Sequence, residues 1–218
     1  MFIIGIDTAT PPQRYSQADC WKAPQEAAPF LKLNRRSKAI LKKVLTGENG
    51  IATRHFALEQ LHRAFDLTPD ALHARFAESA PAIATLAAER ALAHAQTEPR
   101  EVDAFLISTC TGYLCPGLTS YVGERLGLRP DVLALDPVGQ GCAAAAIPNL
   151  LVLRERFQLS DHDVRWSRSV LHEYGNMNSP SVWFVLQAAL ADSVPGGLWW
   201  MSSFGAGFSC HGALLEVE

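Results

Sequence analysis

Residues 132–147 decide the fold and read Val132-Leu-Ala-Leu-Asp-Pro-Val-Gly-Gln-Gly-Cys142-Ala-Ala-Ala-Ala-Ile147. The apolar run Val132–Leu135 predicts a strand, the glycines predict a tight turn, and the alanines predict a helix that begins at Cys142. The thiol is then at a helix N-terminus, where the positive end of the helix dipole favours thiolate over thiol. A cysteine in that place is a candidate nucleophile for covalent acyl chemistry. The alternative is a small, inert core side chain, because free cysteines are usually buried.

The bulk composition restricts the class of protein. The chain has 218 residues, 48% of them hydrophobic, which is enough for one core or two small ones. Its formal net charge of −3 lacks the basic field of nucleic-acid binding, so no nucleic-acid partner is expected. The five cysteines have no metal-ligand spacing, so we expect reduced thiols, no metal and a cytoplasmic location. Neither a signal peptide nor a membrane-spanning run is present, so no membrane partner is expected.

Strand and helix patterns alternate along the chain. Strands are predicted at Phe2–Ile6, Ala104–Ser108, Val132–Leu135, Leu198–Ser202 and Phe208–Val217, the last two antiparallel. Helices are predicted at Leu33–Leu45, Thr68–His94, Ser120–Leu126, Asp161–Glu173 and Ser179–Ala191. Thr68 is expected to cap its helix, and Pro81 to divide that helix in two. The alternation indicates a layered α/β fold.

Three further glycine-marked turns lie where strands or helices end, at 108–117, 174–179 and 203–209. Loops in such places often carry catalytic groups. Taken alone, each turn has an ordinary structural interpretation. Asn176 could cap the helix that begins near Ser179 or adopt a left-handed conformation. Cys115 could be a loop residue beside Pro116.

Together, and in this order, the four turns resemble those of the type III polyketide synthases, the chalcone and stilbene synthase family of the thiolase-like superfamily. The Gln140-Gly-Cys142 turn matches the family's nucleophile turn. The Tyr174-Gly-Asn-Met177 turn matches that of its catalytic asparagine. The loop from Cys110 to Gly117 matches a Cys-Thr-x-Gly…Pro-Gly loop. The Ser203-Phe-Gly-Ala-Gly207 turn matches a Gly-Phe-Gly-Pro-Gly signature imperfectly.

The resemblance implies a thiolase-like layered α/β fold and an acyltransferase that works as a homodimer. An acyl-CoA starter would acylate Cys142, and malonyl-CoA would lose carbon dioxide to give an enolate that attacks the cysteine-bound acyl group. Asn176 would donate a hydrogen bond to the thioester oxygen and stabilise the enolate. No cofactor besides these CoA thioesters is implied.

The same resemblance assigns residues to the substrate cavity. Thr111 and Gly112 would line the acyl cavity. Cys115 would reach across the dimer interface into the partner's cavity. The turn that holds Phe204 and Gly205 would form part of the active-site wall.

The basic stretch from Arg35 to Lys43 has two interpretations. Its side chains could meet the phosphates of CoA, because lysine and arginine suit that task. It could equally be a solvated helix face. Arg54 stands in a pattern that the family often shows, without an assigned role.

Two features depart from the family. Its catalytic histidine, in a His-Pro-Gly-Gly type loop before the asparagine, has no counterpart among the seven histidines here. Family members are also much longer, and the join is expected near Leu150–Leu153. Residues 1–152 would then keep most of the first half of the fold with the nucleophile, and residues 153–218 the end of the second half. An incomplete sheet of this kind would expose apolar faces and unpaired strand edges.

Two functions follow. The first is a type III polyketide synthase-like acyltransferase, impaired because general base and ion-pair help commonly contributes about 10²–10⁴-fold in rate. The second is a catalytically inactive remnant that acts as a dimerisation or interaction module, through the loop region 110–122 and the C-terminal hairpin. The ketoacyl synthase of fatty acid initiation shares the cysteine and the asparagine. The continuation Met177-Asn-Ser-Pro180 favours the polyketide branch.

Overall fold

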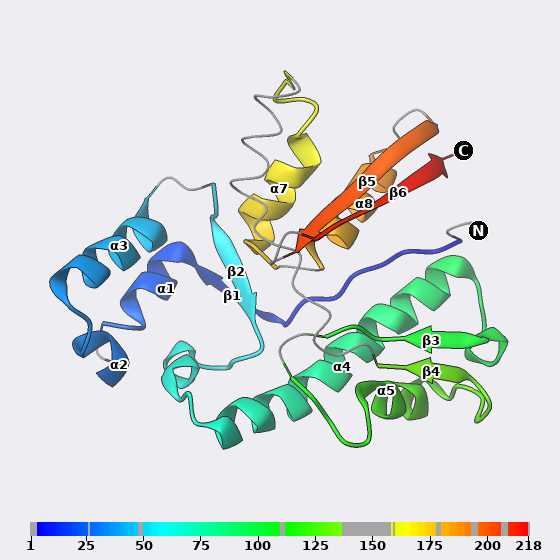
Figure 1. Cartoon of the computed structure of the whole chain (residues 1–218), viewed down its shortest axis with the longest axis horizontal. Helices are drawn as coiled ribbons and strands as arrows, with labels where there is room; N and C mark the ends of the chain where they lie inside the picture. The colour runs from blue at the N-terminus through cyan, green and yellow to red at the C-terminus, as the bar shows by residue number, and fades with distance from the viewer. Residues whose placement is uncertain are drawn as a thin grey trace.

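The computed structural model describes residues 4–25, 27–47, 50–109, 112–136, 158, 160–177, 180–192, 196–205 and 209–217. In these residues the strands form three two-stranded sheets, with helices packed beside them (Figure 1). The pairs are β1 (Gln13–Ser16) with β2 (Thr53–Phe56), β3 (Ala104–Leu106) with β4 (Leu133–Leu135), and β5 (Gly197–Gly205) with β6 (Ser209–Val217). The middle pair is parallel and the other two are antiparallel.

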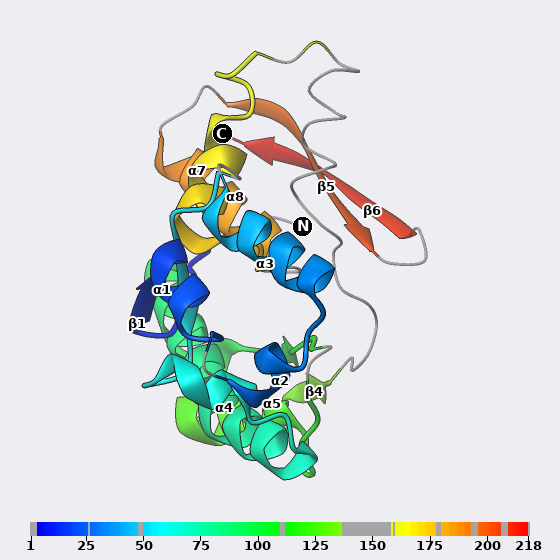
Figure 2. The same ribbon diagram turned by 90° about the vertical axis from the view of Figure 1, so that its left-hand side faces the viewer.

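A small helical unit, seen face-on in Figure 2, stands beside β1 and β2. It consists of α1 (Gln17–Lys22), α2 (Ala28–Leu31) and α3 (Arg35–Thr46). The Asn34 side chain caps α3 by accepting a hydrogen bond from the Ser37 N–H at 2.8 Å. The predicted helix over Leu33–Leu45 is therefore confirmed, with its start two residues later at Arg35.

The long helix α4 (Pro69–Ala95) begins where the sequence predicts, with the Thr68 hydroxyl accepting from the Ala71 N–H. The prediction that Pro81 divides this helix is wrong, because α4 continues through it. Proline removes one backbone hydrogen bond. Pro81 is fully buried, and the Thr85 hydroxyl donates to its carbonyl at 2.7 Å. The packing around Pro81 therefore outweighs the lost bond.

The described core lies between α4, α5 (Leu118–Leu126) and one face of β3. Its centre is a buried cluster of Leu114, Leu118 and Val122. Phe76 of α4 packs against this cluster, and so does Phe105 of β3. A parallel strand pair is thus covered on one side by two helices (Figure 1).

The other face of the parallel pair is open. The register places Leu106 beside Leu135, and alternation puts these two and Leu133 on the face away from Phe105. These leucines are 58%, 46% and 59% exposed, respectively. The prediction of a buried strand at Ala104–Ser108 is therefore wrong for one of its two faces, because no described element covers it.

The total surface is large for the mass. The chain exposes 14448 Å² at 23.8 kDa, whereas a compact monomer of that mass exposes about 9,900 Å². The open face of β3 and β4 contributes to this surface. Such a chain has a small core relative to its length and leaves apolar area available to a partner.

The N-terminal segment differs from the prediction. Residues 4–10 are not in a strand, and Phe2 and Ile3 lie outside the described residues. The Ile6 carbonyl accepts from His94 Nδ1 at 2.8 Å, and the Thr8 carbonyl accepts from Arg90 at 2.9 Å. The Thr8 hydroxyl donates to Gln187 at 2.7 Å. Side chains of α4 thus take up two backbone carbonyls that a neighbouring strand would otherwise bond, and α8 (Ser181–Ala191) contacts the segment through Gln187.

The C-terminal part contains α7 (Arg165–Tyr174), α8 and the β5–β6 hairpin. The hairpin confirms the predicted antiparallel pair, with Gly197 opposite Val217. The predicted cap Ser179 lies outside the described residues, and Pro180 is the residue before α8. The Ala52 N–H donates to the His172 carbonyl at 2.8 Å, which joins the segment before β2 to α7.

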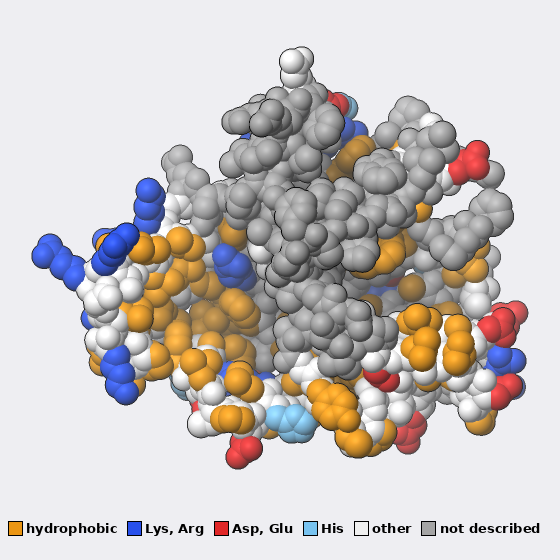
Figure 3. All heavy atoms as spheres, viewed as in Figure 1, with side chains coloured by type: hydrophobic (Ala, Val, Ile, Leu, Met, Phe, Trp, Pro, Cys, Tyr) orange, Lys and Arg blue, Asp and Glu red, His pale blue; other side chains and the backbone are white. Residues whose placement is uncertain are grey.

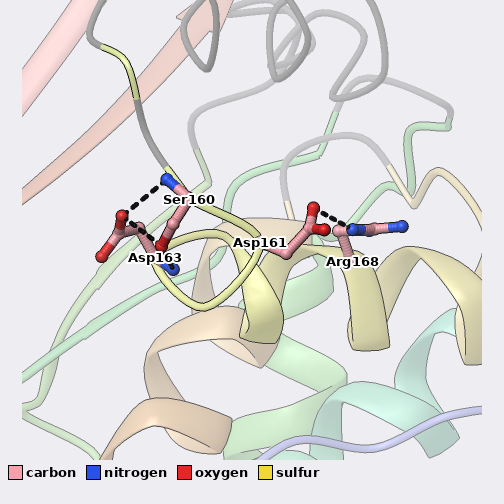
Figure 4. Close-up of polar contacts among 4 residues, drawn as sticks. All are labelled: Ser160, Asp161, Asp163 and Arg168. Carbon is pink, nitrogen blue, oxygen red and sulfur yellow. Dashed lines mark hydrogen bonds and ion pairs between the residues drawn. The ribbon is translucent and has the colours of Figure 1, made fainter.

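A turn over residues 160–164 precedes α7, which begins at Arg165 and not at the expected Asp161. Figure 4 shows its contacts. The Asp163 carboxylate accepts from the Ser160 N–H and from the Ser160 hydroxyl, both at 2.7 Å. Arg168 bonds Asp161 at 2.5 Å. The Ser160 hydroxyl, and then its N–H, lower the pKa of Asp163.

The substitution Ser160→Ala is expected to raise the pKa of Asp163 towards its unfolded value of about 3.9, because the hydroxyl donor is lost. A carboxyl with a lowered folded pKa stabilises the fold above the unfolded pKa, and this contribution disappears as pH falls through the folded pKa. Carboxyl-carbon NMR during an acid titration measures the shift. Asp66, held by Thr68, is the internal reference and stays unchanged. An unmoved Asp163 would contradict the assignment.

Candidate functional site

Asp136 follows β4 directly and precedes the turn predicted to carry the nucleophile. Its carboxylate accepts from the Thr119 N–H at 3.0 Å and also from the Thr119 hydroxyl. Thr119 is the second residue of α5, so the carboxylate lies at a helix N-terminus, where the dipole stabilises an anion. The end of β4 is therefore fixed against the start of α5.

Gly117 makes this contact possible. A Cβ atom on Gly117 would lie 2.3 Å from Asp136 Oδ2, closer than any side chain permits. The predicted loop 110–117 and the predicted nucleophile stretch thus meet at these two residues. Gly117 and Asp136 both stand in stretches that the sequence marks as important, but the sequence alone assigns neither residue a role. The available signal is an aspartate placed immediately after an apolar strand.

Gly112 lines a cavity, but a small one. A Cβ atom on Gly112 would lie 2.3 Å from the Phe76 ring. The cavity measures about 80 Å³, and Tyr113 and Asp136 also line it. Pockets for small ligands are typically about 300–1,000 Å³. The cavity that the described residues form is therefore too small for an acyl chain. Thr111 lies outside the described residues.

Cys115 is an exposed free cysteine that follows the buried Leu114. A hydrogen bond to the Cys115 sulfur raises the pKa of Tyr113. The thiol is therefore at the surface beside the cavity that Gly112 lines. Its position across a dimer interface stays a prediction.

Asn176 lies in the turn after α7. The Gly175 N–H closes the helix by donating to the Leu171 carbonyl at 3.0 Å, and Gly175 has a φ of 73° that favours glycine. Asn176 is exposed and does not have a positive φ, so the left-handed alternative is wrong. It does not cap α8 either, because Pro180 holds that position.

Arg54 of β2 lies against this turn. Its Nε donates to Gln17 Oε1 at 3.0 Å, and a Cβ atom on Gly175 would lie 3.0 Å from Arg54 Nη1. The Thr53 hydroxyl donates to the Glu173 carbonyl at 2.5 Å, one residue before Tyr174. Two neighbouring residues of β2 thus contact the end of α7. Arg54 lies against Gly175, the residue before Asn176.

Tyr174 anchors the same turn in apolar surroundings. Its ring lies 4.9 Å from that of Phe184 and 5.6 Å from that of His55, centroid to centroid. Burial raises the pKa of Tyr174. His55 Nδ1 donates to the Pro11 carbonyl at 2.9 Å.

Other predicted site residues are placed only in part. Cys142 lies outside the described residues, so its distance from Asn176 stays a prediction. Phe204 and Gly205 are the last two residues of β5, opposite Cys210 and Ser209. The predicted turn at Ser203–Gly207 is therefore shorter than expected, because strand pairing continues through Gly205.

The described residues form neither a metal site nor a membrane span. In the ranges that the structure describes, no group of three or more His, Cys, Asp or Glu could hold a metal ion. No helix in those ranges is long and apolar enough to cross a membrane.

Comparisons with known proteins find polyketide synthases and, over shorter stretches, 3-ketoacyl-CoA synthases. The chain is 33% identical over 104 residues to the 1,3,6,8-tetrahydroxynaphthalene synthase of Streptomyces griseus, covering 46% of this chain and 27% of that protein. It is 30% identical over 150 residues to the alpha-pyrone synthesis polyketide synthase-like Pks18 of Mycobacterium tuberculosis, covering 66% and 37%. The type III polyketide synthase domain of Steely1 from Dictyostelium has a TM-score of 0.82 at 15% identity, covering 99% of both chains. No protein-family model matches.

The fold is thus the thiolase-like α/β fold of these synthases. The chain is similar in sequence to polyketide synthases and has the fold of type III polyketide synthases. The sequence matches cover 27% of the length of the first of these relatives and 37% of the second. The relatives' activities therefore do not transfer directly to it.

The substitution Gly117→Ala is expected to lower the free energy of unfolding by about 1–3 kcal/mol, because the new methyl group collides with Asp136. Urea unfolding followed by circular dichroism measures it. In an Asp136→Ala background the same substitution should cost much less, since the opposing oxygen is absent.

Gly123→Ala, inside α5, is the control for Gly117→Ala at its N-cap. Its Cβ atom would meet only Leu128 Cδ1 at 3.7 Å, an ordinary contact. It should raise stability by about 0.5–1 kcal/mol, as alanine does in helix interiors. An equal cost of Gly117→Ala with and without Asp136 would show that this contact does not hold the strand end.

Proposed function

We propose that the chain is a cysteine acyltransferase of the type III polyketide synthase kind, with Cys142 as nucleophile and Asn176 as hydrogen-bond donor. The proposal rests on the contacts made by the segments that lead to Cys142 and to Asn176. Asp136 holds the strand that leads to Cys142 against α5. Arg54 lies against the backbone just before Asn176.

The proposed reaction begins with acyl transfer. The Cys142 thiolate attacks the thioester carbonyl of an acyl-CoA, a new carbon–sulfur bond forms, and CoA leaves as the thiolate. Malonyl-CoA then loses carbon dioxide, and the electron pair of the broken carbon–carbon bond becomes an enolate. The enolate attacks the acyl carbonyl, which forms a carbon–carbon bond and releases the Cys142 thiolate. No cofactor besides the CoA thioesters takes part.

Asn176 contributes electrostatically in this proposal. Its amide N–H donates to the oxygen on which negative charge develops, and one such donor is worth about 10²–10³ in rate in comparable sites. The exposed position of Asn176 lets a substrate oxygen reach it. Thr111, Gly112, Phe204 and Gly205 would complete the acyl cavity, and Cys115 would enter it from the partner of a homodimer.

The activity is expected to be weak. The chain lacks the histidine loop, so Cys142 keeps only the helix dipole to stabilise its thiolate. We further propose that an internal deletion near Leu150–Leu153 separates residues 1–152 from residues 153–218. The absence of the histidine loop from the sequence supports a gap inside the chain.

Incubation with an acyl-CoA and malonyl-CoA, followed by mass spectrometry, tests the proposal. We expect slow acylation of the intact protein by one acyl group and little triketide or tetraketide. Cys142→Ala should abolish the acylation. Cys20→Ala is the matched control and should keep it, because burial raises the pKa of the Cys20 thiol and favours its unreactive form. Acylation that survives Cys142→Ala would refute the nucleophile, and abundant polyketide would refute the impairment.

A second candidate is a non-catalytic interaction module. The open face formed by Leu106, Leu133 and Leu135 favours it, because exposed apolar patches commonly mark protein contacts. The partner would be a full-length type III polyketide synthase, which the thiolase-like fold could match in a mixed dimer.

Co-purification of the chain with a tagged full-length type III polyketide synthase tests this candidate. Leu133→Ser should weaken the complex, because a hydroxyl replaces apolar contact area. Leu67→Ser is the control, since Leu67 is equally exposed elsewhere on the surface. A wild-type chain that remains monomeric and does not co-purify would exclude the module.

A further inference from the structure

The helix α3 concentrates basic charge in an otherwise acidic chain. The chain has a net charge of −3, yet α3 contains no acidic residue. Its basic residues are Arg35, Arg36, Lys38, Lys42 and Lys43. Figure 3 shows lysine and arginine side chains around this end of the molecule, with hydrophobic side chains between them.

The same helix exposes aliphatic side chains. Ile40 is 55% exposed and Val44, one turn further along the same face, is 50% exposed. Leu33, in the link before α3, is also exposed. In Figure 2 α3 lies towards the viewer, at the surface of the molecule.

The inner side of α3 is already occupied. It packs on α1, where Leu41 and Leu45 are half-buried. Ile40 and Val44 therefore form a second apolar strip that the packing on α1 does not use.

The basic side chains remain available. Lys38 is engaged, because its Nζ donates to the Leu31 carbonyl at 3.2 Å and lies 5.3 Å from the Phe30 ring centroid. Among the described residues, no ion pair involves the other four basic side chains of α3. They can therefore meet an anionic partner without breaking an existing pair.

We propose that α3 docks on an anionic phospholipid surface. A bilayer of this kind offers phosphate headgroups to the lysines and arginines and an acyl boundary to Ile40 and Val44. A nucleic acid or a free phosphate would satisfy the charges and leave the aliphatic strip in water. The contact is peripheral, so it is compatible with the absence of a spanning helix among the described residues. It departs from the sequence-based expectation of no membrane partner and does not depend on acyltransferase activity.

Co-sedimentation of the full chain with vesicles tests the proposal. Vesicles of phosphatidylcholine with one third phosphatidylglycerol should bind the protein, and pure phosphatidylcholine vesicles should bind it at least tenfold more weakly. High salt should release the protein, because screening removes the charge attraction. The double variant Lys42→Gln/Lys43→Gln should lower the partition coefficient by about fivefold for each removed charge.

The double variant Ile40→Ser/Val44→Ser isolates the apolar part. It keeps every charge and should still lower binding about tenfold or more, because two buried aliphatic side chains are lost. Leu72→Ser, a change at an exposed leucine of α4, is the control and should bind like the wild type. Circular dichroism confirms that each variant is folded.

Three results would overturn the proposal. The first is equal binding of the wild type to neutral and anionic vesicles. The second is undiminished binding of the Ile40→Ser/Val44→Ser variant, which would leave only a general polyanion contact. The third is release of the bound protein by excess free CoA at constant ionic strength, which would make α3 a CoA-phosphate site. The wild-type measurements with neutral vesicles, anionic vesicles and free CoA test the proposal even if a variant fails to fold.

Discussion

The carboxylate of Asp136 at the N-terminus of α5 is the contact on which the described site depends. It joins three segments, namely the end of β4, the start of α5 and the loop that ends at Gly117. Any side chain larger than hydrogen at position 117 would collide with it. A helix N-terminus supplies unpaired N–H groups and partial positive charge, so an anion there satisfies both needs. This contact fixes the end of β4 against the start of α5.

The asparagine turn is held by a separate set of contacts. Arg54 and Thr53 reach it from β2, more than a hundred positions away in sequence. The N-terminal segment similarly reaches α8 through Thr8 and Gln187. Residues before and after the expected join are therefore packed on one another. A two-part catalytic site needs this, because a nucleophile and an oxyanion donor on different segments must stay aligned without the substrate's help.

The cost of the architecture is visible at β3 and β4. Parallel sheets are normally covered on both faces. Here helices cover the Phe105 face, and the leucines of the other face are exposed. This open face contributes to the large exposed surface of the chain. A protein in this condition has less burial to offset conformational entropy, so its stability and its activity both depend on what covers that face.

The sequence by itself determined the features that depend on neighbouring residues. The Thr68 cap, the strand after Val132, the C-terminal hairpin and the glycine turns follow from local propensity and turn chemistry, and the set of turns identified the class of fold. Tertiary structure decided the rest, because the forces involved act between distant segments. Packing carries α4 through Pro81, and side chains of α4 take the place of a strand partner at Ile6 and Thr8. The meeting of Arg54 with Gly175 depends on long-range contacts that no local pattern encodes.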